Sequence, residues 1–223
     1  LKAEFLYQYQ RANGYSLRNK IFANNAKLNK IGSIFPALTN FMVNQSIVKK
    51  GMGVASKREV PLLAPKTFRK WIDNNKSNYK ANSFHKGKLY LFCDEFTNYY
   101  DVSVGIDAYE LLSQLGYEVL TVDHEESGRA YLSKGFLEEA KAIANKNVSI
   151  FAPIVSHEIP LVGLEPSAIL TFRDEYIRLA DDKENAEKLA KNVFTIEEFF
   201  KNEITSGKIT SDQFSDKVKT INV

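Results

Sequence analysis

Lys88-Leu89-Tyr90-Leu91-Phe92-Cys93 is a short, almost wholly apolar run, and it begins a pattern in which strands and helices alternate. Apolar residues then recur at helical spacing through residues 104–115, and Gly116 ends that predicted helix. A second strand is predicted over residues 117–122. Brief apolar runs that lie between helices are typical of the buried strands of a parallel sheet.

The pattern repeats toward the C-terminus. Residues 136–151 have the apolar stripe of a long helix, which Pro153 bends or ends. A third strand is predicted over 159–164, and Ser167 is the expected N-cap of a helix that runs through Arg178. Successive strand and helix units predict a parallel sheet with right-handed crossovers. The fold class is therefore α/β, with a three-layer, Rossmann-like parallel sheet.

The chain on either side of this pattern is organised differently. The N-terminal third has the spacing of helices joined by short breaks, and Pro36 is expected to begin a new helix rather than to lie inside one. We place a boundary near Ser83, between a helical, basic arm of residues 1–83 and an α/β domain of residues 84–223. Within the domain, the tail is predicted to form a helix around 195–203 and to end in an extended segment.

The net charge of +3 conceals an uneven distribution. Residues 1–88 hold 17 Lys and Arg against 3 acidic residues, whereas residues 89–223 hold 13 against 24. The basic residues are scattered and no groove-reading motif is present, so no nucleic-acid partner is expected. We expect instead that the two halves face one another or that the arm contacts an acidic neighbour. Phe68 and Trp71, close to the boundary, are expected to pack on the α/β half.

Cysteine content and hydropathy limit the possible compartments. No apolar run reaches the length that spans a bilayer, and the first residues lack a secretory pattern. The single cysteine, Cys93, cannot form an internal disulfide, which agrees with a reducing compartment. A cytoplasmic location is therefore expected. One thiol also cannot hold an iron-sulfur cluster, since such clusters generally take four protein ligands.

Polar side chains follow each predicted strand, where the ligands of an open parallel sheet bind. Two interpretations stay open. The carboxylates and His124 can form a divalent-cation, small-molecule or hydrolytic site. Alternatively, the acids cap helices, which we favour because carboxylates interact well with helix N-termini. Arg129 can bind an anion or pair with the acidic residues at the strand ends, and we favour pairing. The candidate polar rim consists of Asp94, Asn98, Tyr99, His124, Arg129 and Glu165.

Three segments carry a resemblance to a known family: residues 94–100 (DEFTNYY), 126–135 (ESGRAYLSKG) and 163–176 (GLEPSAILTFRDEY). Together they resemble the cysteine-rich CCG domain of iron-sulfur oxidoreductases. Within that family, the chain resembles the branch in which this domain follows an FAD-linked oxidase that dehydrogenates D-2-hydroxy acids such as D-lactate or glycolate. Where that family usually has Cys-Cys-Gly-Arg-Pro, this chain has Glu126-Ser127-Gly128-Arg129-Ala130.

The resemblance implies that all four cluster ligands have been replaced. The family's cysteine positions correspond to Glu95, Glu126, Ser127 and Ala168. Soft thiolates suit iron, and a carboxylate and a hydroxyl do not substitute for them. We therefore expect this chain to hold no metal, no cofactor and no catalytic residue, and we expect FAD and iron-sulfur clusters elsewhere in a parent enzyme.

The resemblance also implies an organisation. The resemblance implies a linker followed by the first repeat of a tandem, and a start at Leu1 inside a helical pattern suggests a fragment of a larger protein. The function expected from it is a non-catalytic docking and electron-transfer-associated region. Expected partners are other domains of the parent chain and a membrane quinone or electron-acceptor protein, with peripheral association at the inner membrane surface. The alternative is a freestanding module that uses the acidic rim and His124.

Overall fold

The computed structural model describes residues 1–79 and 85–215. At its centre is a four-stranded sheet in the order β2-β1-β3-β4, with every neighbouring pair parallel. The strands are β1 (Gly87–Phe92), β2 (Tyr117–Leu120), β3 (Leu161–Gly163) and β4 (Val193–Thr195). The predicted α/β fold with a parallel sheet is confirmed. The strand order changes direction between β1 and β3, so the carboxyl ends of these strands form the usual ligand-binding position of such a sheet.

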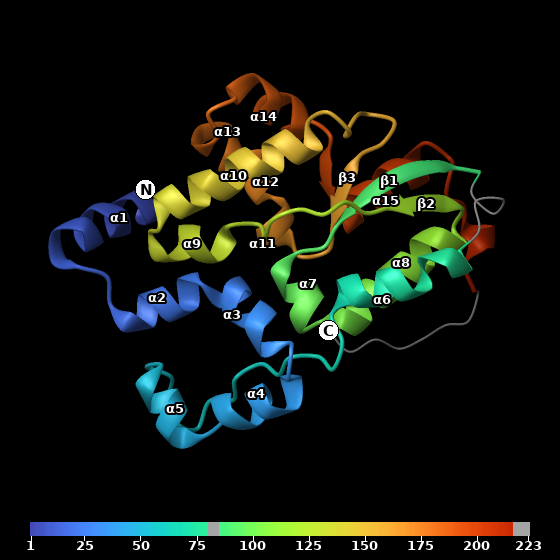
Figure 1. The fold of residues 1–223 in the computed structure, drawn as a ribbon. Coiled ribbons are helices and arrows are strands. Elements are labelled where there is room, and N and C mark those ends of the chain that lie inside the picture. The colour runs from blue at the N-terminus through green and yellow to red at the C-terminus, as the bar shows by residue number, and fades with distance from the viewer. Residues whose placement is uncertain (80–84, 216–223) are drawn as a thin grey trace.

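Helices cover both faces of the sheet and produce three layers (Figure 1). Leu89 and Leu91 of β1 pack into one apolar cluster, and Phe92 packs into another on the opposite face. The first face carries α6 (Phe68–Asn75), α8 (Val102–Gln114) and α15 (Ile196–Thr205). The second face carries α10 (Leu137–Phe151), α11 (Pro166–Ile169), α12 (Thr171–Asp174), α13 (Tyr176–Leu179) and α14 (Lys183–Ala190).

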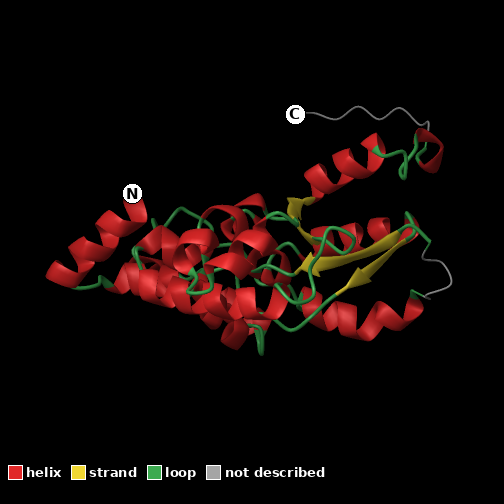
Figure 2. Ribbon diagram, turned by 90° about the horizontal axis from the view of Figure 1, so that it is seen from above, coloured by secondary structure: helices red, strands yellow, loops and turns green. Residues whose placement is uncertain are grey.

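The N-terminal arm forms short helices beside the sheet, so that the strands and α1 lie at opposite ends of the molecule (Figure 2). Pro36 begins a helix, as predicted. The helices α1 and α2 pack against α9 (Arg129–Lys134), and α3 packs against α7 (Glu95–Tyr99). The arm helices are α1 (Lys2–Asn13), α2 (Leu17–Ala23), α3 (Asn25–Gly32), α4 (Pro36–Val43) and α5 (Ser46–Gly51).

Gly135 lets α1 approach α9 closely. This glycine ends α9 with a φ of +72°, and a Cβ atom there would lie 2.6 Å from the Cβ of Leu6. Only glycine satisfies both the left-handed backbone and the close contact.

The segment that leads into the domain is packed on the sheet. Phe68 is fully buried, and the Trp71 ring is half-buried with its centroid 5.7 Å from that of Tyr109. The expected packing of these two aromatic residues is therefore observed. The predicted boundary at Ser83 lies outside the described residues, as does the extended segment predicted at the C-terminus.

Two predictions around β3 were wrong. Glu165, rather than Ser167, caps the following helix, because its longer side chain reaches forward to accept from the Ser167 amide (3.3 Å) and hydroxyl (2.7 Å). The helix expected through Arg178 is divided into α11, α12 and α13. Thr171 lies at one of the breaks, where its hydroxyl donates to the carbonyl of Ser167 at 2.9 Å, a bond that bends helices.

Within residues 1–79 and 85–215, the fourth strand and two short 3-10 helices were not predicted. Strand β4 has three residues and runs directly into α15 at Ile196, so no turn separates it from the helix in the sequence. The 3-10 helices are η1 (Lys76–Asn78) and η3 (Ser211–Gln213). Among the described helices, none combines the length and the apolar character needed to cross a membrane.

Candidate functional site

The candidate site begins where β1 ends. Asp94 is fully buried and caps α7, because its Oδ1 accepts from the amides of Phe96 (2.8 Å) and Thr97 (2.9 Å). Its Oδ2 accepts from the Thr97 hydroxyl at 2.7 Å. Burial raises the pKa of Asp94, and the bonds from Thr97 and Phe96 oppose that rise. Asp94 therefore has the capping role favoured for the rim acids.

Glu95 and Ser127 join the ends of β1 and β2. The Glu95 side chain is 3% exposed, and its Oε1 accepts from the Ser127 hydroxyl at 2.6 Å. Its Oε2 accepts from the Ser127 backbone amide at 2.9 Å. Burial raises the pKa of Glu95, while the two bonds from Ser127 lower it. We call this two-bond contact the Glu95–Ser127 pair. It ties the loop after β2 to the first turn of α7.

The loop after β2 is held from its other side by Asn147 and Tyr176, both buried. The Asn147 amide nitrogen donates to the Glu126 carbonyl (2.8 Å), and its oxygen accepts from the Glu125 amide (3.1 Å). The Tyr176 hydroxyl donates to the Ser127 carbonyl at 2.9 Å and accepts from Asn147. The backbone of residues 125–127 is thus held by the side chains of Asn147 and Tyr176.

Glu126 differs from its neighbours because part of its carboxylate is unsatisfied. Its Oε2 atom is buried and has no hydrogen-bond partner among the described residues. Burial, followed by the negative charge of Glu95, raises the pKa of Glu126 to about 8, although Lys27 opposes the change. Ser127 Oγ accepts from the Arg129 amide at 3.1 Å at the start of α9, whereas the Glu126 side chain provides no cap for that helix.

His124 has both ring nitrogens engaged. Its Nε2 accepts from the Cys93 amide at 3.3 Å, and its Nδ1 lies 2.6 Å from the Glu125 carbonyl. The ring also stacks on Phe92, with centroids 4.5 Å apart. Burial, followed by the positive charge of Arg69, lowers the pKa of His124 to about 3. A neutral imidazole with both nitrogens hydrogen-bonded has no lone pair for a metal ion.

Cys93 and Arg69 complete the strand-end crevice. Burial raises the pKa of the Cys93 thiol to about 12, so the group is an inert thiol at neutral pH. Arg69 donates to Asp123 at 2.9 Å and to the His124 carbonyl at 3.0 Å. Within the described part of the chain, no group of three or more His, Cys, Asp or Glu side chains is arranged to hold a metal ion.

Of the remaining predicted residues, Asn98 lies beside Arg69, whereas Arg129 and Glu165 have partners elsewhere. Asn98 accepts from the Arg69 amide at 3.1 Å, and Tyr99 is half-buried on α7. Glu165 caps α11. Arg129 pairs with Glu175 at 2.6 Å, so the expected pairing with a rim acid was wrong, because α13 brings a closer carboxylate. Ala168 is fully buried in the apolar cluster under α10.

At the positions that the resemblance assigns to the family's cysteines, the donor atoms do not suit an iron-sulfur cluster. Glu95 and Ser127 are bonded to each other, and Ala168 offers only a methyl group. Such clusters generally require four protein ligands, most often thiolates. The arrangement instead provides a buried, hydrogen-bonded connection between two strand ends.

Sequence reasoning missed Asn147 and Tyr176, the two residues that fix the loop. A signal for Asn147 was present, because it is the polar member of the otherwise apolar stripe of α10. A polar residue in an apolar stripe is buried only when its hydrogen bonds are satisfied. Tyr176 gave no comparable signal, since its ring packs in the core like any other aromatic residue.

Comparison with known proteins agrees with the resemblance seen in the sequence. The chain is 27% identical over 198 residues to a D-2-hydroxyglutarate dehydrogenase of Escherichia coli (strain K12), a match that covers 83% of this chain. It is 26% identical over 164 residues to the enzyme of that name from Haemophilus influenzae, covering 69% of the chain. A third, from Pantoea ananatis, is 25% identical over 153 residues, covering 63% of the chain.

This chain resembles part of a D-2-hydroxy acid dehydrogenase. The similarity to the 2-hydroxy acid dehydrogenase family expected from the three sequence segments is therefore confirmed. The matches cover 19%, 16% and 15% of these three relatives, so the chain spans less than a fifth of their length. No family model matches the chain, and no solved structure matches it.

Proposed function

We propose that this chain is a non-catalytic, structural region of a flavin-dependent, iron-sulfur dehydrogenase that oxidises a D-2-hydroxy acid. The similarity to D-2-hydroxyglutarate dehydrogenases supports the class of parent enzyme. It also favours D-2-hydroxyglutarate over D-lactate or glycolate as the substrate of that parent. FAD and the iron-sulfur clusters belong, in this proposal, to parts of the parent outside this chain.

The observation that carries the proposal is the Glu95–Ser127 pair. In this proposal it occupies the place where the family's first and third cysteines would meet, and it joins the strand ends with two hydrogen bonds of 2.6 and 2.9 Å. The pair supplies the mechanical connection that a bound cluster would otherwise give. A repeat that keeps its fold but has hydrogen-bonded side chains in place of cluster ligands has a structural role rather than a role in electron transfer.

Anaerobic reconstitution tests this part of the proposal. After incubation with iron and sulfide and removal of the excess, the chain is expected to be colourless and to contain no stoichiometric iron. The matched variant carries cysteine at all four family positions, Glu95, Glu126, Ser127 and Ala168. It is expected to bind zinc or iron at least weakly, provided that its circular dichroism matches the parent chain. Stoichiometric iron in the unaltered chain would overturn the proposal.

The exposed face of the arm supports a docking role. Residues 17–58 contain eight Lys and Arg and no Asp or Glu. On α3 to α5 and the turn before α4, large apolar side chains are more than half exposed. Exposed apolar residues surrounded by charge of one sign are typical of a protein interface. The expected partner surface is an acidic domain of the parent chain with an apolar centre. The face comprises Ile31, Ile34, Phe35, Leu38, Phe41, Met42 and Ile47.

The activity of the parent is tested separately. The polypeptide that carries this chain, purified from its source, is expected to reduce an artificial dye with D-2-hydroxyglutarate and to do so faster than with D-lactate. Faster reduction with D-lactate would overturn the choice of substrate. No reduction with any D-2-hydroxy acid would overturn the proposed parent activity.

A further inference from the structure

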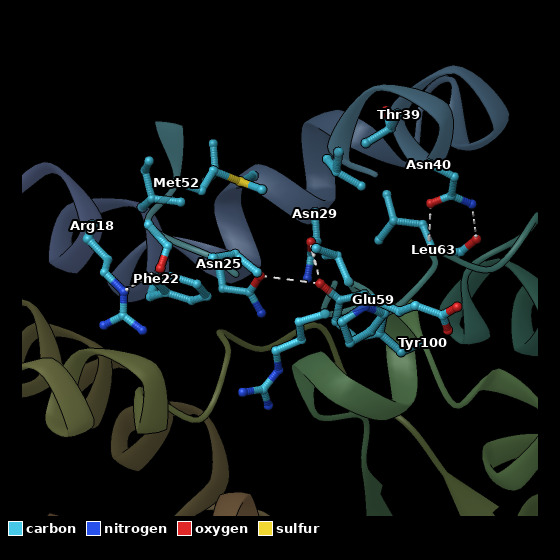
Figure 3. Close-up of a pocket in the computed structure, with 18 of the residues that line it drawn as sticks. Arg18, Phe22, Asn25, Asn29, Thr39, Asn40, Met52, Glu59, Leu63 and Tyr100 are labelled. Carbon is cyan, nitrogen blue, oxygen red and sulfur yellow. Dashed lines mark hydrogen bonds between the residues drawn. The ribbon is translucent and has the colours of Figure 1, made fainter. Parts of the chain in front are cut away.

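A cavity of about 460 Å³ lies between the arm and the end of α7 (Figure 3). It is lined by residues of α2, α3 and α4 and of the segment 52–63, with Tyr100 and Lys134 completing the wall. Neither Glu95 nor Ser127 lines it, so it is separate from the site at the strand ends. Its volume lies within the range of small-molecule sites.

The wall of this cavity is mainly apolar. Side chains from three helices and the following segment contribute hydrocarbon or aromatic surface, among them Ile21, Phe22, Leu28, Val43, Val54 and Leu63. Apolar walls with a few placed polar groups are the usual composition of a site for an organic molecule. The occupant suited to this wall therefore has an apolar body.

One buried polar group in the lining lacks a partner. Asn29 is 6% exposed, and its Oδ1 accepts from the Tyr100 hydroxyl at 2.8 Å. Its Nδ2 has no hydrogen-bond partner among the described residues. Asn40, which also lines the cavity, bonds the Leu63 carbonyl and amide at 2.9 and 2.8 Å. Since buried donors are normally satisfied, the Asn29 amide points to an acceptor on a ligand.

Two cations gather at one end of the cavity without a carboxylate partner. The Arg18 guanidinium lies 5.1 Å and the Lys134 ammonium 5.6 Å from the centre of the Phe22 ring. Neither cation takes part in a salt bridge of the described residues. Burial, followed by the charges of Arg18 and Lys2, lowers the pKa of Lys134. The one acidic residue in the lining, Glu59, is drawn on the opposite side from Arg18 (Figure 3).

We propose that this cavity binds a small organic anion with an apolar body, such as a medium-chain carboxylate. The hydrocarbon part contacts the apolar wall, and the carboxylate lies beside Arg18 and Lys134. Asn29 donates its unused N–H to an oxygen of the ligand. An uncharged molecule of the same size would contact the apolar wall but would leave Arg18 and Lys134 without a counter-ion. The site therefore selects for the charged form.

Isothermal titration calorimetry on the 223-residue chain with octanoate, and with octanol as the uncharged match, tests this proposal. Octanoate is expected to bind at one site and more tightly than octanol. Arg18→Ala is expected to weaken octanoate binding on the order of tenfold, the loss of one charge-assisted contact. Arg18 is exposed, so this change should leave the fold intact. Val43→Phe, which fills the cavity, should weaken both probes.

Two control variants separate the cavity from other apolar surface. Arg11 lies over the Tyr7 ring at 5.5 Å on the same arm but does not line the cavity, so Arg11→Ala should leave octanoate binding unchanged. Phe41→Ala, on the exposed face of α4, should also leave it unchanged. The proposal is overturned by equal affinity for octanol and octanoate, by the absence of saturable binding, or by binding that Arg18→Ala does not weaken.

Discussion

Replacing Ser127 with alanine tests whether the Glu95–Ser127 pair stabilises the fold. The variant loses the 2.6 Å bond from the hydroxyl to Glu95 and the 3.1 Å bond that the hydroxyl accepts from the Arg129 amide. Hydrogen bonds to a charged group contribute about 1.5–3 kcal/mol, and neutral ones about 0.5–1.5 kcal/mol. Because the carboxylate that loses its partner is buried, we expect the free energy of unfolding to fall by about 2 to 4 kcal/mol.

Urea denaturation measures this loss as a lower midpoint with an unchanged slope. Ser149→Ala is the matched control, since this serine lies exposed on α10 and bonds only a carbonyl of its own helix. Its effect should stay within about 0.5 kcal/mol. If Ser127→Ala cost less than about 1 kcal/mol, the pair would be no stronger than an ordinary helix cap, and its proposed structural role would be refuted.

Three further predictions concern other buried contacts. Because the folded pKa of Glu126 is raised from 4.5 to about 8, its favourable contribution is complete below pH 4.5 and is lost as the pH rises through about 8. Glu126→Gln should therefore raise the melting temperature above pH 8 but not below pH 4.5. Equal changes in melting temperature in the two pH ranges would contradict the raised pKa of Glu126. Phe68→Ala should lower the free energy of unfolding by about 3–5 kcal/mol and Trp71→Ala by less, because only Phe68 is fully buried; an unchanged free energy of unfolding in chemical denaturation would show that this segment is merely a tether. Gly135→Ala should loosen the packing of α1 on α9, because the new Cβ would overlap Leu6. Limited proteolysis near the N-terminus should then be faster than in the unaltered chain, and an unchanged rate would show that this contact is unimportant.

The sheet was predictable because its main strands have clear sequence signals. Three apolar runs separated by helical periodicity specified β1, β2 and β3. Strand β4 gave no such signal, because its three residues run directly into α15 with no turn between them. The breaks between the short helices α11 to α13 gave no signal either. There a local side-chain bond from Thr171 competes with continued helical structure, and propensity alone does not include that competition.

The sequence predicted which residues lie at the candidate site but not how their side chains contact one another. The acids at the strand ends follow from the topology of a parallel sheet, which brings all carboxyl ends to one edge. That Glu95 would bond Ser127 while Glu126 remained partly unsatisfied depends on side-chain directions that sequence spacing does not fix. The choice of Glu175 as the partner of Arg129 depends in the same way on where α13 lies.

The bond from the Ser127 amide to Glu95 has a consequence for hydrogen exchange. This amide lies in a loop, outside any helix or strand, yet it is buried and bonded to a carboxylate 32 residues away. Its acceptor follows β1 and the amide follows β2, so the bond connects the segments that leave these two neighbouring strands. We expect its exchange rate to match the slowest strand amides, which report global unfolding. A single loop amide would then measure the stability of the whole sheet.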